Sequence, residues 1–561
     1  MKKLINDPRN LVREVLESVV STSRGVALLE HENVVVQNVP ARREGRPVAV
    51  LSGGGSGHEP GHAGYVGHGM LSGAIAGDVF TSPSVDAVLN AIRAVGGPAG
   101  ALLIVKNYTG DRLNFGLAAE LATGEGIPTR VVLVGDDVSL HQTVSIDHRR
   151  GIAGTILVHK IAGATAAAGG SLDEVVAAAQ AAAHSVGTMG VALGPCTLPS
   201  VGKPGFILGD DEIELGLGIH GEQGVQRMKL QPADALVRTI VETIISDRKF
   251  AAGTRVAILV NGLGATPPIE LAVVSRAALA IAREHGLVVE RLYTGVFLSA
   301  LDMPGASVSL IEVNDQTLSR LDAPTSAKGW TDDGYVAEKV TILPAPAPAA
   351  AATEAVDGPQ SAAMRAVAAA IAAKLIASED FLAETDSKTG DGDLGASMVR
   401  GAEALKSLPD AAFNTPSDFL AALSEALRRQ IAGSSGPFYA VGLARAARRL
   451  SGNANPDAAD WRGAFLDAIA AVTELGGAQP GDRTMVDALA PAAAALGGED
   501  RASMIKAMAA AAASGAEATA AMAPKLGRAS YLGERTLGHP DAGAVAVSIW
   551  LGALAEVLTE Q

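Results

Sequence analysis

The sequence has a single cysteine, Cys196, among 561 residues. A disulfide framework within one chain is therefore excluded, and a zinc site built on several thiolates is not expected. We find no uninterrupted apolar run of about 18 residues, so we expect no membrane-spanning helix. The N-terminal segment Met1 to Pro8 is not followed by the apolar core of a signal peptide. These absences together favour a cytoplasmic protein.

Aromatic residues and positive charge are also scarce. Aromatic residues make up 3% of the chain, too few for the stacking platforms that bind single-stranded nucleic acid. The formal net charge of −15 disfavours nucleic acid or an anionic membrane as the main partner. Hydrophobic residues reach 48% and charged residues 19%, which excludes a disordered chain. At roughly 100–200 residues per domain, the length predicts two to four folded units.

Alternating proline and alanine mark the sharpest change in composition, from Pro344 to Pro359. Such segments favour extended polyproline II and act as semi-rigid spacers. A surface loop inside one domain is the alternative, but the pattern of the sequence differs on the two sides. We therefore predict a first domain over residues 1–343, a linker over residues 344–359 and a second domain over residues 360–561.

Short β-branched runs alternate with helical stretches before the proposed linker. Candidate strands cover Pro47–Leu51, Ala101–Val105, Thr129–Val134 and Arg255–Val260. Strands that alternate with helices predict an α/β domain with a largely parallel sheet, although mixed pairing stays open. Ligands of such sheets lie beyond the carboxyl ends of the strands.

The sequence after the proposed linker is rich in alanine and has little strand signal. Apolar residues recur at helical spacing over Ser361–Thr385, Asp418–Ile431, Ala464–Leu475, Met485–Leu496 and Ala502–Met522. Alanine has the highest helix propensity, and its small side chain permits close helix packing. We predict that the second domain is entirely α-helical.

A glycine-rich segment follows the first strand, from Leu51 to Pro60. Glycines let backbone amides approach a ligand closely. The segment is not a Walker A loop, since no Gly-Lys-Ser/Thr follows, and it lacks the dinucleotide-binding spacing. His58 and His62 are four residues apart, but Pro60 and Gly61 between them disfavour a helical metal site.

Three further polar residues lie in turns of the first domain. Lys106 and Asp111 flank a turn after the Ala101–Val105 strand, where Asp111 is either a hydrogen-bonding or basic group for a hydroxyl, or a helix cap. His220 stands among glycines between Gly216 and Glu222. A neutral imidazole is a nucleophile at pH 7, but a turn histidine without a role is an equal alternative from chemistry alone.

Three aspartates gather on a short loop of the second domain: Asp386, Asp391 and Asp393. Nearby anions repel one another unless a cation neutralises them, and hard oxygen ligands favour Mg²⁺ or Ca²⁺. An EF-hand is excluded because its twelfth position would be Ser397 rather than glutamate. The alternative is an acidic surface turn that is solvated and binds no metal ion.

Two small-residue loops of the second domain could cradle phosphates. One runs from Ala432 to Pro437, and the other, from Pro480 to Asp487, would place Arg483 beside a phosphate if the loops converge. Each loop taken alone is more often structural.

The motifs, taken in order, resemble those of the single-chain dihydroxyacetone kinases, in which a substrate-binding K domain is fused to a nucleotide-binding L domain. The resemblance covers essentially the full length. It rests on SGGGSGHEP (52–60), GYVGHGML (64–71), GDVFTSPS (77–84), KNYTGD (106–111), GIHGE (218–222), VNGLGATP (260–267), GDGD (390–393), GSSG (433–436), GDRTMVDAL (481–489) and GRASYLGER (527–535).

The resemblance implies roles for residues of the first domain. His220 is expected to bond covalently to the carbonyl of a short hydroxyketone as a hemiaminal, which favours ketones and aldehydes over glycerol. Gly55, Ser56, Gly57, His58, Lys106 and Asp111 are expected to hold the substrate. His58 and Asp111 are the expected acid/base pair.

For the second domain, the resemblance implies a barrel of antiparallel helices that binds Mg-ATP. Asp386, Asp391 and Asp393 are expected to hold two Mg²⁺ ions that bridge the ATP phosphates. The residues expected to contact the nucleotide are Leu394, Gly395, Ala396, Ser397, Ser434, Ser435, Gly476, Thr484, Met485, Asp541, Ala542 and Gly543. A homodimer formed through the K domain is also implied.

The sequence leaves the exact activity open. An ATP-dependent kinase acting on dihydroxyacetone, D- or L-erythrulose or glyceraldehyde is the main prediction. A component recharged by a phospho-carrier protein is an alternative, as is a ketone-sensing regulatory protein. A side reaction that cyclises a flavin nucleotide, known in some relatives, would use the same metal site.

Overall fold

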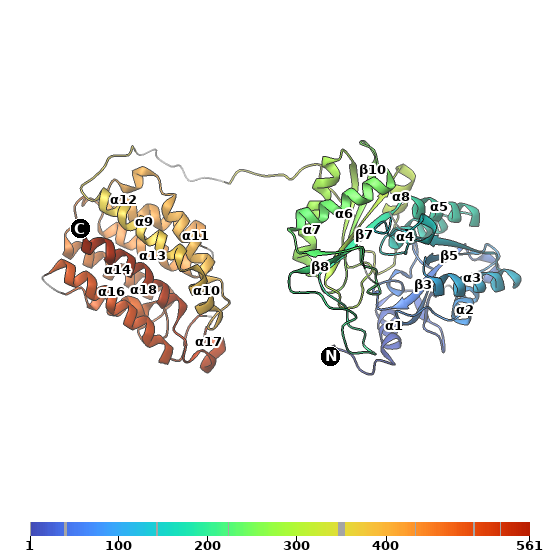
Figure 1. The fold of residues 1–561 in the computed structure, drawn as a ribbon, viewed down its shortest axis with the longest axis horizontal. Helices are drawn as coiled ribbons and strands as arrows, with labels where there is room; N and C mark the ends of the chain where they lie inside the picture. Colours follow the sequence, from blue (N-terminus) through green and yellow to red (C-terminus); the bar gives the residue numbers. More distant parts are fainter. Residues whose placement is uncertain are drawn as a thin grey trace. The chain divides into compact units, whose positions relative to one another are not determined.

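The computed structural model describes residues 2–38, 42–141, 144–222, 224–345, 354–431, 433–497, 500–527 and 529–560. The chain divides into two compact units, Met1–Ile342 and Leu343–Gln561 (Figure 1). Part of the predicted linker, 346–353, and Ala432 of the predicted phosphate loop lie outside the described residues.

The N-terminal unit contains two six-stranded sheets. The first has the order β1 (Val26–Leu28), β2 (Val34–Gln37), β4 (Gly73–Val79), β3 (Ala49–Ser56), β5 (Ala101–Lys106) and β6 (Thr129–Val134). The second has the order β11 (Val288–Gly295), β10 (Arg255–Gly262), β12 (Gly305–Glu312), β7 (Gly187–Ala192), β8 (Glu212–Leu215) and β9 (Gln226–Lys229).

The predicted α/β class is confirmed, but the prediction of largely parallel pairing holds only for the first sheet. There, β4, β3, β5 and β6 pair in parallel. In the second sheet only β10 and β11 are parallel, and β12, β7, β8 and β9 pair antiparallel. Parallel neighbours need long crossovers, which helices provide, whereas antiparallel neighbours do not.

Helices cover both faces of the first sheet. The helices of this unit are α1 (Leu11–Thr22), α2 (Val85–Val95), α3 (Thr109–Gly124), α4 (Thr155–Ala167), α5 (Leu172–Ser185), α6 (Ala233–Arg248), α7 (Pro268–Glu284) and α8 (Asp315–Asp322). Leu51 and Leu103 pack with α2 and α3, and Val50 and Leu102 pack with α4 and α5. Because both faces are buried, these strands are continuously hydrophobic rather than alternating.

Helix starts in this unit follow recognisable capping signals. The Ser84 side chain accepts a hydrogen bond from Ala87 N at the start of α2, and Ser171 and Glu174 form a capping box on α5. Helices α6 and α7 pack on one face of the second sheet through Ile240, Ile258 and Ile281.

The C-terminal unit is entirely helical over its described residues, as predicted. Its helices are α9 (Ser361–Ala377), α10 (Glu379–Ser387), α11 (Leu394–Lys406), α12 (Pro416–Gln430), α13 (Ser435–Arg449), α14 (Ala458–Gly476), α15 (Val486–Ala494), α16 (Arg501–Ala518), α17 (Ala529–Leu532) and α18 (Ala542–Glu560). Helix α9 contacts α11, and successive neighbours lead through α12 to α16 and on to α18, which contacts α9 again. The eight helices therefore close a ring around an alanine-rich core.

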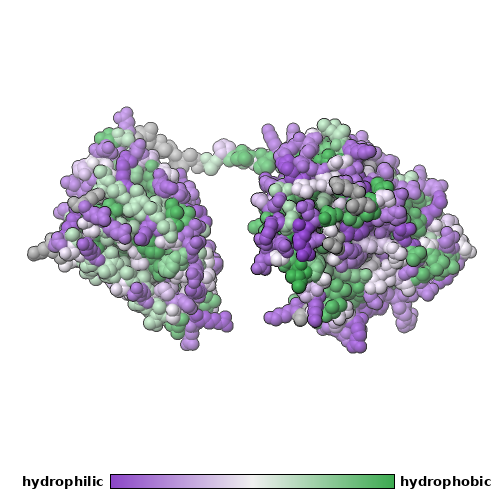
Figure 2. Space-filling view, viewed as in Figure 1, coloured by the Kyte–Doolittle hydropathy of each residue, from purple (hydrophilic) through white to green (hydrophobic). Residues whose placement is uncertain are grey.

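Helix α18 is the one described helix that is long and apolar enough to cross a membrane by length and composition. It packs against α9, α15 and α16, and Val547 and Leu551 are fully or almost fully buried in the core of this unit. Figure 2 shows hydrophilic residues over much of the visible face of each unit, with smaller hydrophobic patches among them. This packing is that of a core helix in a folded domain.

Candidate active site

Two histidines from distant parts of the chain contact each other in the N-terminal unit. His58 follows β3, and His220 lies in the loop between β8 and β9. Their Nε2 atoms are 3.1 Å apart. His58 is fully buried, whereas the side chain of His220 retains 19% of its surface exposed. His220 is therefore the accessible imidazole of the pair.

The second nitrogen of each ring is held by an oxygen. Nδ1 of His58 donates to the Ser299 carbonyl at 2.8 Å, and Nδ1 of His220 donates to Glu222 Oε1 at 2.9 Å. Glu222 Oε2 also accepts from the backbone N–H of His220 at 2.9 Å. Burial alone would raise the pKa of Glu222, but hydrogen bonds and the charge of His220 lower it to about 2. An ionised carboxylate thus holds His220 at two points.

Aromatic rings flank the histidine pair. Phe80 stacks on His58 and meets His220 edge-on, with ring centroids 5.1 Å and 5.0 Å apart, respectively. The ring centroid of Tyr108 is 4.7 Å from that of His220. The Tyr108 hydroxyl is buried and has no hydrogen-bond partner among the described residues. These rings give the pair largely apolar walls with one polar group left unsatisfied.

Lys106 and Asp111 also leave buried polar atoms unsatisfied. Lys106 ends β5 and is fully buried, and its Nζ has no hydrogen-bond partner among the described residues. Asp111, in the first turn of α3, is 3% exposed, and its Oδ1 likewise has none. A Cβ built on Gly54 would lie 3.3 Å from both Lys106 Nζ and Asp111 Oδ2, so both groups face the glycine-rich segment. Buried polar atoms without partners point to a bound polar ligand.

Burial shifts the protonation of these groups. It lowers the pKa of Lys106, against the attraction of Asp111 and other carboxylates. It raises the pKa of Asp111, partly offset by Lys106 and a hydrogen bond from Ser82. Burial, followed by the charges of Lys106 and His220, keeps the pKa of His58 well below its ordinary value. Such shifts concentrate at functional sites.

The glycine-rich segment was predicted to be a loop after the first strand. Its first residues instead form the C-terminal end of β3. Residues 53–56 belong to β3, which pairs with both β4 and β5. A Cβ on Gly55 would lie 2.7 Å from Phe80 Cα, and Gly57 has a φ of +95°. The Ser56 hydroxyl donates to the Gly77 carbonyl at 2.7 Å. These glycines therefore let Phe80 approach β3 closely, and Ser56 fastens the strand end to β4.

A cavity of about 540 Å³ lies on another side of this segment. Its walls include Val12, Leu16 and Val19 of α1 together with Gly54, Gly55 and Ser56. His220, Lys106 and Asp111 are absent from the residues that line it. The histidine pair therefore does not belong to this cavity.

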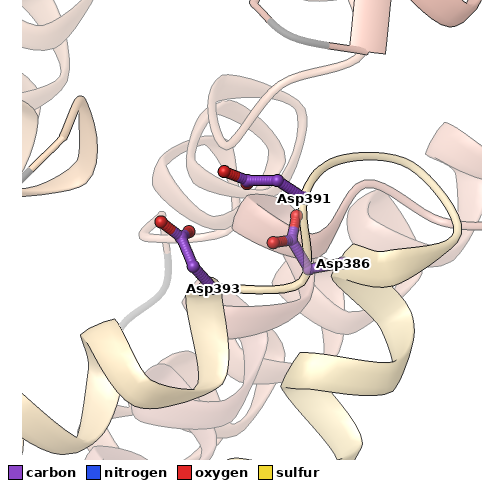
Figure 3. A group of neighbouring side chains, drawn as sticks. All are labelled: Asp386, Asp391 and Asp393. Carbon is purple, nitrogen blue, oxygen red and sulfur yellow. The ribbon is translucent and has the colours of Figure 1, made fainter. Parts of the chain in front are cut away.

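Three carboxylates converge in the C-terminal unit (Figure 3). Asp386 lies in the last turn of α10, Asp391 lies in the following loop, and Asp393 precedes α11. One oxygen from each lies within 4.8 Å of the others, and Asp391 and Asp393 are exposed. All-oxygen donors of this charge and spacing fit a hard divalent cation such as Mg²⁺. The sequence prediction of a converging acidic cluster is confirmed as geometry.

The residues expected to contact nucleotide lie at helix ends of the C-terminal unit. Leu394, Gly395, Ala396 and Ser397 form the first turn of α11, Ser434 and Ser435 begin α13, Gly476 ends α14, Thr484 and Met485 precede α15, and Asp541, Ala542 and Gly543 begin α18.

Several of these ends meet. A Cβ on Gly476 would lie 2.8 Å from the Phe438 ring, and Phe438 and Met485 pack against the same buried cluster, which includes Val486. A Cβ on Gly543 would lie 3.8 Å from Met485 Cβ. Asp541 accepts from Ala544 N at 2.8 Å, and burial raises its pKa to about 6. The ends of α13, α14, α15 and α18 thus form one patch of small residues.

Arg483, which was predicted to lie beside a phosphate if the two loops converge, is buried, and its Nη1 has no hydrogen-bond partner among the described residues. Its side chain is 1% exposed and donates to the backbone carbonyls of Thr519, Thr536 and His539. Its φ of +62° turns the chain before α15. Arg483 fastens the segment before α15 to the segment before α18.

Comparison with known proteins explains why these features occur together. The model of the Dak1 domain matches residues 17–329, and that of the DAK2 domain matches residues 388–556. A putative 3,4-dihydroxy-2-butanone kinase from Solanum lycopersicum is 42% identical over 100% of this chain and 98% of its own. The chain belongs to the dihydroxyacetone kinase family.

Other members of the dihydroxyacetone kinase family match over the same length. Human triokinase/FMN cyclase is 40% identical over 99% of both chains. The crystal structure of the C. freundii dihydroxyacetone kinase in complex with AMP-PNP and Mg²⁺ has a TM-score of 0.65, with 35% identity and 99% of both chains covered. The predicted family, with its fused K and L domains, is confirmed.

The sequence prediction missed three side chains around His220 in this family member: Phe80, Tyr108 and Glu222. Phe80 and Tyr108 lie inside motifs on which the family resemblance rests, GDVFTSPS (77–84) and KNYTGD (106–111). An aromatic residue beside a turn, however, more often belongs to the hydrophobic core than to a functional site. Glu222 is the last residue of the motif GIHGE (218–222), two residues after His220, and its place in that motif was the available signal. No sequence feature pointed to the Ser299 carbonyl, which is 241 residues from His58.

Proposed function

We propose that this chain is an ATP-dependent kinase that phosphorylates a terminal hydroxyl of a short hydroxyketone, with dihydroxyacetone and a tetrulose such as D- or L-erythrulose as the candidate substrates. The observation that carries the proposal is that Lys106 Nζ and Asp111 Oδ1 are buried without hydrogen-bond partners among the described residues, and that Asp111 also interacts electrostatically with the accessible imidazole of His220. A small polyhydroxy molecule would satisfy both atoms. Family membership and the full-length relatives support the kinase class.

His220 supplies the covalent hold in this proposal. Its Nε2 attacks the ketone carbonyl carbon and forms a hemiaminal. A ligand of so few atoms has little binding energy, so a covalent bond compensates for the freedom that the substrate loses. The same requirement excludes glycerol, which has no carbonyl.

Asp111 and His58 are the proposed acid/base groups. Burial raises the pKa of Asp111 toward values at which a carboxylate accepts a proton from the attacking hydroxyl. His58 is kept neutral by burial and lies against Nε2 of His220, where it serves the carbonyl oxygen. Lys106, together with the backbone at Gly55, Ser56 and Gly57, orients the substrate oxygens.

The C-terminal unit is the proposed Mg-ATP domain. The three-aspartate cluster offers the donor set for Mg²⁺, and we propose that Asp386, Asp391 and Asp393 hold two ions. Bound Mg²⁺ would neutralise phosphate charge during phosphoryl transfer. The first turn of α11 and the small-residue patch at the ends of α13, α14, α15 and α18 would hold the nucleotide. The N-terminal unit is then the K domain, through which we propose a cytoplasmic homodimer.

Release of ADP tests this function. Purified protein with ATP and Mg²⁺ is assayed against dihydroxyacetone, glyceraldehyde, D-erythrulose, L-erythrulose and glycerol. We expect ADP with at least one carbonyl compound and none with glycerol. Asp391→Asn should lower the rate by about 100-fold or more, because a metal ligand loses its charge. Asp380→Asn, an exposed aspartate of α10 outside the cluster, is the matched control and should retain the rate.

Other outcomes would identify other functions. No ADP with any carbonyl compound would contradict the kinase, and turnover restored only by a phosphorylated carrier protein would show a carrier-dependent component. Ketone binding without any turnover would indicate a sensor. Consumption of a flavin nucleotide without ketone would reveal a cyclase activity at the same aspartates.

A further inference from the structure

The hydrogen bonds of the His58–His220 pair determine how many protons it carries. At one end the Ser299 carbonyl can only accept, so Nδ1 of His58 carries a proton. At the other end the ionised Glu222 carboxylate can only accept, so Nδ1 of His220 also carries one. The two Nε2 atoms then face each other at 3.1 Å. Two lone pairs cannot share this distance, so one proton lies between them.

The pair therefore holds three protons on four nitrogens and carries one positive charge. His58 is the poorer site for that charge, since burial and then Lys106 lower its pKa. His220 is partly exposed and lies against the Glu222 carboxylate. The Glu222 carboxylate therefore lies on the His220 side of the shared proton.

The charged groups around the pair are consistent with this arrangement. Lys106 of β5 repels a proton on His58, and Asp111 of α3 is attracted to His220. Arg150 contacts Asp137 at 2.6 Å and the Gly216 carbonyl at 2.9 Å, and its charge also attracts the Glu222 carboxylate. Glu222 is the carboxylate that contacts His220 directly.

We propose that Glu222 is a positioning residue, and that its carboxylate balances the positive charge on the His220 ring both before and after the ketone is attached. The proposal rests on the covalent step of the proposed function and specifies the group on which that step depends. A space requirement supports it, because a Cβ on Gly218 would lie 2.0 Å from Glu222 Oε2. Glycine at this position leaves the carboxylate room to reach both N–H groups of His220.

Formation of the hemiaminal needs no proton from solvent. The shared proton first moves from Nε2 of His220 to Nε2 of His58. The freed lone pair of His220 forms the bond to the carbonyl carbon, and the C=O π pair moves to oxygen. His58 then gives the shared proton to that oxygen, which becomes the hemiaminal hydroxyl. The alkylated His220 ring keeps its Nδ1 proton and one positive charge, still opposite Glu222.

Nitrogen spectroscopy of the ligand-free protein tests the charge balance without any kinase activity. Histidine labelled with ¹⁵N reports which ring nitrogens carry protons, and His220→Gln and His58→Gln assign the signals. In Glu222→Gln we expect the pH at which the pair loses its third proton to fall by about one unit or more, because an opposite charge at contact distance is removed. Glu222→Asp, which keeps the charge, should recover part of the shift.

A matched control distinguishes loss of the Glu222 charge from destabilisation of the loop that carries His220. Glu214 is 3% exposed and accepts from Gly224 N and Arg227 Nε, so it braces the same loop without contacting the ring of His220. Glu214→Gln should leave the titration midpoint of the pair unchanged. A midpoint in Glu222→Gln equal to that of the wild type, or an equal shift in Glu214→Gln, would overturn the proposal.

The adduct itself is measured with dihydroxyacetone labelled with ¹³C at C2, in the absence of ATP. Attachment converts a ketone carbon to a tetrahedral one and moves its signal far upfield. We expect Glu222→Gln to weaken adduct formation by roughly 10- to 100-fold, the usual range for one charge-assisted hydrogen bond. An adduct of undiminished affinity in Glu222→Gln would overturn the proposal. If the wild type forms no adduct while its histidine pair still titrates as expected, the covalent step of the proposed function fails and the charge pairing stands.

Discussion

Two buried lysines of the N-terminal unit differ in what their ammonium groups contact. Lys160 Nζ donates to the carbonyls of Arg320 and Ala323 at 2.7 Å, whereas Lys106 Nζ has no hydrogen-bond partner in the part of the chain that the structure describes. Lys106→Met should therefore weaken ketone binding by roughly 10- to 100-fold, since it removes one charged hydrogen bond to the substrate. The stability of the ligand-free protein should change by no more than about 1 kcal/mol, because the lost attraction for Asp111 is offset by removal of an unsatisfied charge.

Lys160→Met is the matched comparison for this prediction. It should destabilise the protein by about 1–3 kcal/mol, because two buried carbonyls lose their donor, and it should leave ketone binding unchanged. Isothermal titration with dihydroxyacetone and urea unfolding measure the two effects. Equal effects of the two substitutions on ketone binding would contradict a substrate role for Lys106.

The contacts of individual side chains were also the feature that the sequence predicted least completely. His58 and His220, predicted from separate motifs, do meet, and Lys106 and Asp111 face the same segment. The burial of Arg483 and its contacts with the carbonyls of Thr519, Thr536 and His539 were not predicted, because they depend on segments that are distant in the sequence. A motif indicates which side chains are present, whereas their partners are set by tertiary packing.

At the scale of elements, the junction of α10 and α11 depends on the absence of a side chain. A Cβ on Gly395 would lie 2.3 Å from the Glu379 carbonyl oxygen and 3.0 Å from Ala383 Cβ. Gly395→Ala should push the first turn of α11 away from α10 and separate Asp393 from Asp386. We expect a loss of about 1–3 kcal/mol in stability and weaker Mg-nucleotide binding, measured by urea unfolding and by fluorescence titration with a labelled ATP analogue.

Gly552 provides the contrast within the same unit. It lies inside α18 with open space where a Cβ would be. Gly552→Ala should stabilise the unit by about 0.5–1 kcal/mol, because glycine is a poor helix former, and should leave nucleotide binding unchanged. A stabilising Gly395→Ala would show that the two helices can separate without cost.

Helices and buried strands were the most predictable elements. Ala101–Val105 and Thr129–Val134 were predicted within one residue of β5 and β6, because continuous β-branched runs leave few alternatives. The glycine-rich end of β3 was predicted as a loop because glycine disfavours strands locally, and pairing with β4 and β5 overrides that preference. The antiparallel pairing of the second sheet depends on chain connections that strand periodicity does not encode.

For the molecule as a whole, hydrophobic packing separates the two units. The clusters of the N-terminal unit use residues up to Trp330, and those of the C-terminal unit begin at Met364. The sequence pattern changes near Pro344, where a proline- and alanine-rich segment has few large apolar residues that could join two cores. Two separate cores predict two unfolding events rather than one.

Calorimetry of the full chain should therefore resolve two transitions, each moved by one ligand. Dihydroxyacetone at about 100 times its dissociation constant should raise only the transition of the N-terminal unit, and Mg²⁺ with a non-hydrolysable ATP analogue only that of the C-terminal unit. Such occupancy stabilises a domain by about 2.7 kcal/mol, or roughly 4 °C for the N-terminal unit and roughly 6 °C for the smaller C-terminal unit. Asp391→Asn should abolish the nucleotide shift and spare the ketone shift, and His220→Ala should do the reverse. A single transition moved by either ligand alone would mean that the units unfold as one body, and that the proposed division into a substrate domain and a nucleotide domain is wrong.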